Sequence, residues 1–231
     1  MFLTPLIITL VFMVISMIVS SRLKSKFKEY SQVQLSKDLS GADVARLMLA
    51  DHGITDVKVI SVEGQLTDHY NPAERTVNLS AEVYQGRNAA ATAVAAHECG
   101  HAVQHAKAYA PLKLRSALVP VQSVSGKLMN FLTLAMMFGS LMVNSFFTDA
   151  LLLIIACNVV FTLFALVTLP VEFDASSRAL AWIQNRSIVT RQEHAMAKDA
   201  LHWAAMTYVV AALAALANLA YYLMIFLSRR D

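Results

Sequence analysis

Apolar residues gather in four long runs along the chain, separated by segments that contain the charged residues. The runs cover residues 2–21, 128–148, 150–170 and 203–228, and they contain no Asp, Glu, Lys, Arg or His. A helix needs about 20 apolar residues to cross the hydrocarbon core of a bilayer. A buried core helix is the alternative for any single run, but four runs leave too little polar sequence to cover them. The pattern therefore predicts an integral membrane protein with about four transmembrane helices.

The first run has a second possible interpretation, that of a cleaved signal peptide. A signal peptide has a basic stretch before its apolar run and a small-residue cleavage site after it. Here the uncharged MFLTPL comes first and the basic RLKSKFK follows, so we expect a retained anchor at residues 1–21. Because Lys and Arg beside a membrane segment stay preferentially on the cytoplasmic side, residue 22 is predicted to be cytoplasmic and the N-terminus external.

Alternating crossings then predict the remaining organisation of a multi-pass cell-membrane protein. Residues 22–127 and 171–202 are expected at the cytoplasmic face, 128–170 as a transmembrane hairpin that turns near Asp149, and 203–231 as the last transmembrane segment. The two cytoplasmic segments contain all of the Lys and Arg residues except Arg229 and Arg230, which disagree with the predicted side. This bias supports the orientation.

Composition adds limits on the class of protein. Hydrophobic residues make up 57% of the chain and charged residues 15%, whereas about a quarter of a soluble domain is charged. The net charge of +3 includes no basic run beyond the flank of the first anchor, so no nucleic-acid partner is indicated. Cys99 and Cys157 provide no disulfide framework, which agrees with a reducing compartment.

The segment after the first anchor predicts a small folded part. Residues 40–53, SGADVARLMLADHG, have a capping Ser40, apolar residues at helical spacing and a stop at Gly53, which indicates a short amphipathic helix. Residues 57–62 and 75–80 alternate apolar and polar positions as half-buried strands do. Turn residues separate the two, so the simplest prediction is an antiparallel hairpin.

A second helix is predicted between a capping Asn88 and Pro111, and it contains the sequence HECGH. His97 and His101 lie one turn apart, about 6 Å along the axis and on one face, so both imidazoles can reach one zinc ion. Glu98 projects beside them and can hold the water that a metal activates. This spacing is typical of zinc hydrolases, and chance polar residues on a helix are the alternative.

Two neighbours on that helix are expected to have other roles. His105 continues the face of the two histidines but lies about 12 Å from His97 along the axis, too far to share a tetrahedral site. Cys99 is on roughly the opposite side, so we expect it to pack as a small hydrophobe.

A catalytic zinc ion needs a third protein ligand and an open position for water. The longer motif with a third His six residues after the second is absent, because Lys107 occupies that position. Glu172 is a candidate, since it follows Pro170 where the third apolar run meets the predicted cytoplasm and a new helix is expected to begin. Capping of that helix is an equal alternative, and Asp174 with Arg178 fits a surface ion pair.

Several stretches of the chain resemble the YugP-type family of membrane zinc metallopeptidases. They are AAHECGHAVQHAKAYAPLKLRSALVP, LTDHYNP and VEFDASSRA, together with the order of the membrane segments. The resemblance covers nearly the whole chain and extends more distantly to the HtpX heat-shock membrane proteases and the CAAX prenyl proteases. It implies a mainly α, gluzincin-like membrane protein whose cytoplasmic catalytic part is small, α+β and zincin-like.

In those distant relatives a second motif reads Glu, aromatic, any residue, Ala, Asp, and its first Glu binds zinc. The match begins at Glu172, so the resemblance implies that His97, His101 and Glu172 bind Zn²⁺ and that Glu98 is the catalytic base. The chain departs from the motif at Ser176, where relatives have an Asp that orients a zinc-bound His. A hydroxyl accepts that hydrogen bond more weakly, or another carboxylate replaces it.

The expected activity is that of a zinc metalloendopeptidase acting on membrane or misfolded proteins. Zinc lowers the pKa of its bound water toward about 7 and polarises the substrate carbonyl, while Glu98 takes the proton and passes it to the departing amine. Residues 75–80 are a candidate edge strand for an extended peptide. Four side chains are candidate donors to the oxyanion: His105, Tyr109, Arg178 and His202.

Two other functional classes are considered. A zinc-binding regulator or adaptor without turnover would need only the ligands, so the presence of Glu98 argues against it. A transporter would place ionisable groups inside its membrane segments, and the four apolar runs contain none.

Overall fold

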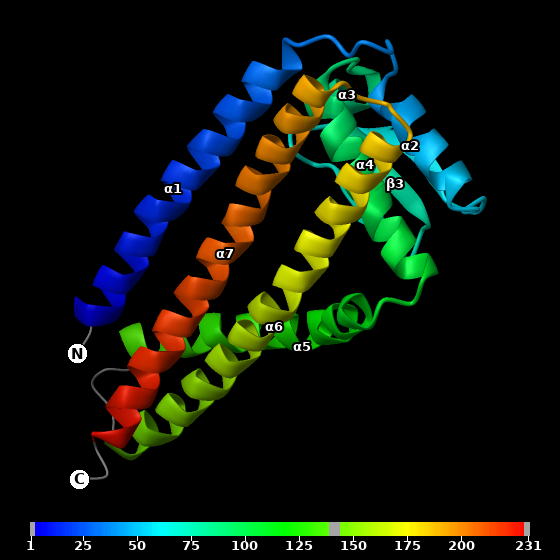
Figure 1. Cartoon of the computed structure of the whole chain (residues 1–231). Helices are drawn as coiled ribbons and strands as arrows, with labels where there is room; N and C mark the ends of the chain where they lie inside the picture. The colour runs from blue at the N-terminus through cyan, green and yellow to red at the C-terminus, as the bar shows by residue number, and fades with distance from the viewer. Residues whose placement is uncertain (1–2, 139–143, 229–231) are drawn as a thin grey trace. The chain divides into compact units, whose positions relative to one another are not determined.

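The computed structural model describes residues 3–138 and 144–228, and these residues are mainly helical (Figure 1). The predicted helical class is therefore confirmed. In chain order the elements are α1 (Leu3–Ser31), α2 (Gly41–Asp51), β1 (Lys58–Val62), β2 (His69–Asn71), β3 (Thr76–Ser80), α3 (Ala81–Gln85), α4 (Ala89–Ala106), α5 (Ala110–Phe138), α6 (Asn144–Asn185) and α7 (Arg191–Leu227).

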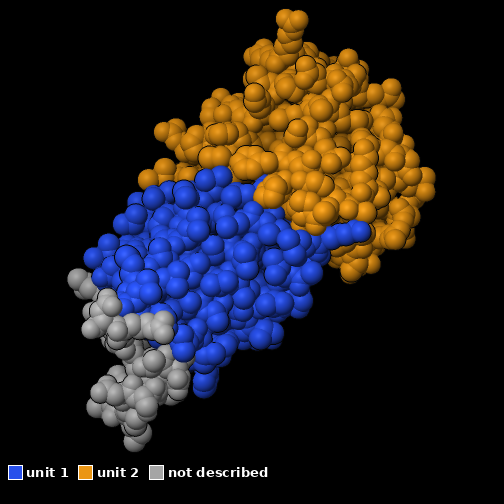
Figure 2. All heavy atoms as spheres, turned by 60° about the horizontal axis from the view of Figure 1, so that its bottom comes forward, with its two compact units in different colours: residues 1–17, 113–169, 208–231 blue, residues 18–112, 170–207 orange. Residues whose placement is uncertain are grey.

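The chain divides into two compact units, coloured separately in Figure 2. Unit 1 contains residues 1–17, 113–169 and 208–231, and unit 2 contains residues 18–112 and 170–207. Helices α1, α5, α6 and α7 contribute residues to both units. Unit 2 contains the three strands and the histidine-bearing helix α4, so the candidate chemistry lies there.

Within residues 3–138 and 144–228, three helices are long and apolar enough to cross a membrane: Leu6–Ser31, Ala150–Asn185 and Arg191–Leu227. They correspond to the first, third and fourth predicted runs. In unit 1 many of their apolar side chains face outward, as expected for lipid contact; Leu6 is 54% exposed and Met224 62% exposed.

The second predicted run, residues 128–148, differs from the other three. Residues 139–143 lie outside the described part of the chain, α5 ends at Phe138 and α6 begins at Asn144. No fourth candidate span is found among the described residues. The turn predicted near Asp149 is wrong, because residue 149 lies inside α6; one Asp in an apolar run does not interrupt helical hydrogen bonding.

The strand pairing also differs from the prediction. The sheet order is β1-β3-β2, with β1 parallel to β3 from Lys58 opposite Thr76 onward and β2 antiparallel to β3. The predicted antiparallel hairpin of 57–62 and 75–80 is therefore wrong. Residues 69–71, predicted as part of a turn, form a strand on the other side of β3 from β1. The segment that joins β1 to β3 is therefore long enough to allow these two strands to pair in parallel. Since β3 is central and buried, it does not offer the free edge expected of residues 75–80.

Helix α2 begins and ends as its sequence predicts. The Ser40 side chain accepts a hydrogen bond from the Asp43 amide, and the Asp43 carboxylate accepts one from the Ser40 amide at 3.0 Å, which completes a capping box. After α2 ends at Asp51, Gly53 adopts a φ of +68°, a left-handed conformation that favours glycine.

Helix α4 begins where predicted but ends early. The Asn88 side chain accepts a hydrogen bond from the Ala91 amide at 2.8 Å. The helix ends at Ala106, and Ala108 has a φ of +52° in the turn that follows. Pro111 therefore does not end α4. It lies in the first turn of α5, where a missing amide hydrogen costs little.

Helix α6 continues through Pro170 from Asn144 to Asn185. The prediction that a new helix begins after this proline is therefore wrong. The proline removes one amide donor, but packing on both sides keeps the segment helical. Val171 and Ala175 are fully buried, so the part of α6 after the proline belongs to the core of unit 2.

A glycine determines how closely α4 and α6 approach. A Cβ atom added at Gly100 would lie 2.6 Å from the backbone oxygen of Ala175, closer than Cβ atoms come in proteins. Cys99, which precedes Gly100, is fully buried. Its Sγ atom lies 3.5 Å from the carbonyl oxygen of Ala45. Burial raises the pKa of this thiol, so the predicted packing role of Cys99 is confirmed.

Candidate metal centre

The two histidines of α4 lie side by side in unit 2. The ring centroids of His97 and His101 are 4.8 Å apart, and the rings meet edge to face. Four-residue spacing on a helix places side chains on one face, which accounts for the meeting of the rings. His101 is buried and His97 is half-buried.

Helix α6 brings a carboxylate to this pair. Glu172 Oε2 lies 3.3 Å from His97 Nε2 and 3.6 Å from His101 Nε2. The candidate ligand atoms of the three residues are all within 4.8 Å of one another. Glu172 is only 2% exposed. The structure therefore brings together the three residues that the sequence and the resemblance single out.

The outer nitrogen of each imidazole has its own partner. Ser176 Oγ lies 3.1 Å from His97 Nδ1, and Gln104 Oε1 lies 3.0 Å from His101 Nδ1. An amide oxygen only accepts, so His101 donates its Nδ1 hydrogen to Gln104, which leaves Nε2 as the nitrogen available to a metal. That nitrogen lies 3.6 Å from Glu172 Oε2. This donor set, two imidazole nitrogens and one carboxylate, suits zinc.

Ser176 is the residue at the position where the resemblance implies an orienting Asp. Its hydroxyl reaches the same kind of atom, the Nδ1 of a histidine. Hydroxyl and carboxylate differ in charge, so Ser176 fixes the ring orientation while adding no negative charge beside His97.

Gln104 is held in turn by α6, and the sequence analysis missed it. Its amide nitrogen donates to the Val171 carbonyl at 2.7 Å and to Asp174 Oδ2 at 2.8 Å. Arg178 Nε donates to the same Asp174 oxygen at 2.6 Å. The Asp174 and Arg178 pair is thus more than a surface ion pair, because through Gln104 it supports His101. The contact of Gln104 with His101 could have been predicted from their three-residue spacing, which places both side chains on one face of the helix.

Glu98 lies beside the three residues with its carboxylate mostly buried. It is 8% exposed, and its Oε2 accepts a hydrogen bond from the Tyr70 amide of β2 at 3.0 Å. Glu172 therefore lies against the histidine pair, and the buried Glu98 is near enough for its charge to raise the pKa of His101. Burial of negative charge is costly without a cation, so the site favours a bound cation.

The same charges act on His101. Burial alone would lower the pKa of this imidazole, but its hydrogen bond to Glu172 and the charges of Glu98 and Glu172 outweigh burial and raise the pKa. A positive charge at this position is thus stabilised by the surrounding carboxylates.

Four other side chains were considered as oxyanion donors. His105 is exposed, and its Nδ1 lies 2.7 Å from the Tyr70 hydroxyl. The Arg178 guanidinium lies 5.7 Å from the centre of the Tyr109 ring while it binds Asp174. The ring of His202 contacts Trp203 on α7. Their roles toward a substrate remain predictions.

Comparisons with known proteins agree with this arrangement. The family model described as "Putative neutral zinc metallopeptidase" matches residues 5–227. A protein named "Putative membrane protease YugP", from Bacillus subtilis (strain 168), is 42% identical over 210 residues, which cover 91% of each chain. A search of solved structures gives no match.

Proposed function

The chain belongs to this family of zinc metallopeptidases, and from that premise we propose that it is a membrane-embedded, zinc-dependent endopeptidase. His97, His101 and Glu172 are the proposed ligands of the zinc ion, and Glu98 is the proposed general base. The observation that carries the proposal is the approach of Glu172, from a distant helix, to the Nε2 atoms of both histidines.

The proposed chemistry is hydrolysis of a peptide bond. A zinc ion bound here would polarise the substrate carbonyl and lower the pKa of a coordinated water toward about 7. Glu98 accepts the proton of the attacking water and later delivers it to the departing amine. The Tyr70 amide, which donates to Glu98 Oε2, holds the carboxylate in place for both steps.

The free edge of β2 is the proposed place for the substrate chain. In the described sheet β2 is an outer strand, and the Tyr70 amide points away from β3 toward Glu98. The Tyr70 amide is engaged by Glu98, so an extended peptide added along this edge would form its hydrogen bonds with other main-chain groups, and it would run past the general base. This replaces the central strand β3 as the recognition edge. Unfolded segments of membrane or misfolded proteins have the extended form that it requires.

The exchange Glu98→Gln tests this function. It removes the base and keeps the size of the side chain, so we expect the purified protein in detergent to retain zinc while hydrolysis of unfolded casein falls by at least about a hundredfold. Glu74→Gln is the matched control, because Glu74 is an exposed Glu outside the metal centre. Casein hydrolysis by Glu98→Gln at the parental rate would contradict the proposal. Zinc binding without hydrolysis in the parent chain would instead indicate a regulator.

A further inference from the structure

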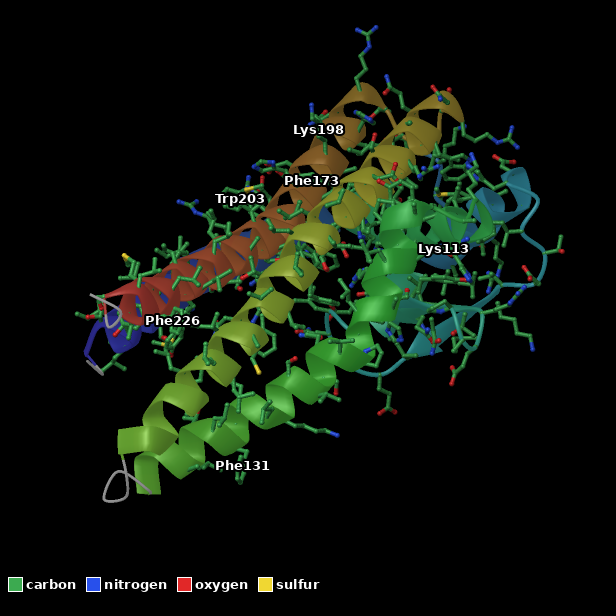
Figure 3. The ribbon with its side chains drawn as sticks, turned by 90° about the horizontal axis from the view of Figure 1, so that it is seen from below. Lys113, Phe131, Phe173, Lys198, Trp203 and Phe226 are labelled. Atoms are coloured by element: carbon green, nitrogen blue, oxygen red, sulfur yellow. The ribbon has the colours of Figure 1, made fainter. Side chains whose placement is uncertain are left out.

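A cavity of about 420 Å³ lies between α6 and α7 in unit 2. The three proposed zinc ligands do not line it. Its polar lining comes from Ser176, Ser177 and Gln184 on α6 and from His194, Lys198 and His202 on α7. Figure 3 labels Lys198 on α7 and Phe173, a further lining residue, on α6.

The lining residues of α7 form a stripe that can bear positive charge. His194, Lys198 and His202 follow one another at four-residue spacing, so they share one face of the helix. Among the described residues that line the cavity there is no Asp or Glu. The adjacent acid, Asp199, accepts a hydrogen bond from the Tyr30 hydroxyl at 2.6 Å. Its charge is therefore engaged on another side of the helix.

Two of these side chains lack partners within the part of the chain that the structure describes. The Nε2 atom of His194 is buried without a hydrogen bond, and Lys198 forms neither an ion pair nor a hydrogen bond there. An unsatisfied buried polar atom costs free energy. The His194 Nε2 atom is enclosed by protein, whereas Lys198 and Ser177 are exposed. A ligand with several acceptor oxygens would accept hydrogen bonds from the Lys198 ammonium group and the Ser177 hydroxyl.

The rest of the lining is apolar and comes from Phe173, Leu180 and Leu201. A small inorganic anion makes no use of such a surface, whereas an amphiphile does. Both helices continue into predicted transmembrane segments, at residues 150–170 and 203–228, which adjoin the lining residues. Trp203, which follows His202, is the type of residue enriched where membrane meets water. Basic pockets between membrane helices bind the headgroups of anionic lipids.

We propose that this cavity binds the phosphate group of an anionic membrane phospholipid, with Lys198 as the charged donor to its oxygens and the apolar residues against its glycerol and acyl carbons. Lys198 lies on α7 and is not among the proposed zinc ligands. The cavity borders the metal centre at two points, because Phe173 follows Glu172 in α6 and because Ser176, which contacts His97 Nδ1, also lines the cavity.

Binding is measured by calorimetric titration of the full-length, delipidated protein in a nonionic detergent. Three probes are compared: short-chain phosphatidylglycerol, phosphatidylcholine with the same acyl chains, and inorganic phosphate. We expect phosphatidylglycerol to bind most tightly. Lys198→Gln should weaken its binding about fivefold, the contribution of one Lys near an anionic lipid, and Lys198→Arg should preserve it. Lys58→Gln, an exposed Lys of β1, removes the same charge elsewhere and should change nothing.

Equal affinity for the two lipids, or equal effects of Lys198→Gln and Lys58→Gln, would overturn the proposal. Binding of inorganic phosphate as tight as that of phosphatidylglycerol would assign the site to a free anion and overturn its assignment to a lipid. Zinc content and casein hydrolysis are measured on the same samples. Loss of lipid binding with both of these intact would separate this site from the metal centre.

Discussion

The histidines of the metal centre depend on side chains that hold their outer nitrogens. Gln104 fixes His101 and is itself fixed by Asp174, whereas Ser176 reaches His97 alone. Partners of this kind set the tautomer and orientation of a metal ligand. The ring of His101 is therefore fixed more firmly than the ring of His97, whose Nδ1 atom contacts, among the described residues, only the Ser176 hydroxyl.

We predict that Ser176→Ala weakens zinc binding by about ten- to a hundredfold, because His97 loses the partner that orients it. Zinc affinity is measured by competition with a chromophoric chelator. Ser177→Ala is the control, since that neighbouring hydroxyl is exposed and has no contact with either histidine. Equal affinities of the two variants would show that Ser176 does not position His97.

How far the site could be predicted from the sequence depends on whether each residue lies close in the sequence to the residues it contacts. The relation between His97 and His101 follows from helical spacing alone. Glu172 comes from another helix, so residue spacing did not decide whether it binds the metal or caps a helix. Only the resemblance identified it as a ligand. The contribution of Gln104 could not be predicted, because it depends on where Asp174 and the Val171 carbonyl lie once α4 and α6 have packed.

At the scale of elements, the approach of α4 to α6 decides whether the site forms. Gly100 lies between the two histidines in sequence and permits contact with Ala175 of α6. The turn of α6 that contains Ala175 also follows directly on Glu172. A change in helix spacing at this point would therefore move the carboxylate away from the imidazoles.

We predict that Gly100→Ala destabilises the protein by about 1–3 kcal/mol, since the added methyl group meets a backbone oxygen that has no room to move. Zinc affinity should fall as well. Gly126→Ala is the matched control: it also lies in a helix, its added Cβ meets nothing within 4 Å, and alanine favours helices. The melting temperature of each variant in detergent is the measurement. A Gly100→Ala protein as stable as the parent would contradict the assigned role.

Among the elements, helix starts were more predictable than strand partners. Ser40 and Asn88 cap their helices through hydrogen bonds to residues three positions on, so a short window of sequence contains the whole signal. Pairing of β1 with β3 depends on where the three-residue strand β2 lies, and alternation of residues contains no information on strand direction. Continuation of α6 through Pro170 likewise depends on tertiary packing.

For the molecule as a whole, the orientation in the membrane remains a prediction. The basic residues between the first and second apolar runs predict that unit 2 lies in the cytoplasm. We predict that a Lys37→Cys variant in intact cells reacts with a membrane-impermeant maleimide only after the membrane is opened. Background labelling should be low, because Cys99 and Cys157 are buried. Labelling of closed cells would place the metal centre on the outer side.

The central claim is that one zinc ion is held jointly by the two histidines of α4 and by Glu172 of α6. The most direct measurement is the zinc content of the purified protein and of its Glu172→Gln variant, with Glu74→Gln as the matched control. We predict about one zinc ion per chain in the parent and the control, and almost none in Glu172→Gln at unchanged helix content. A Glu172→Gln variant that retains zinc with parental affinity would contradict the account.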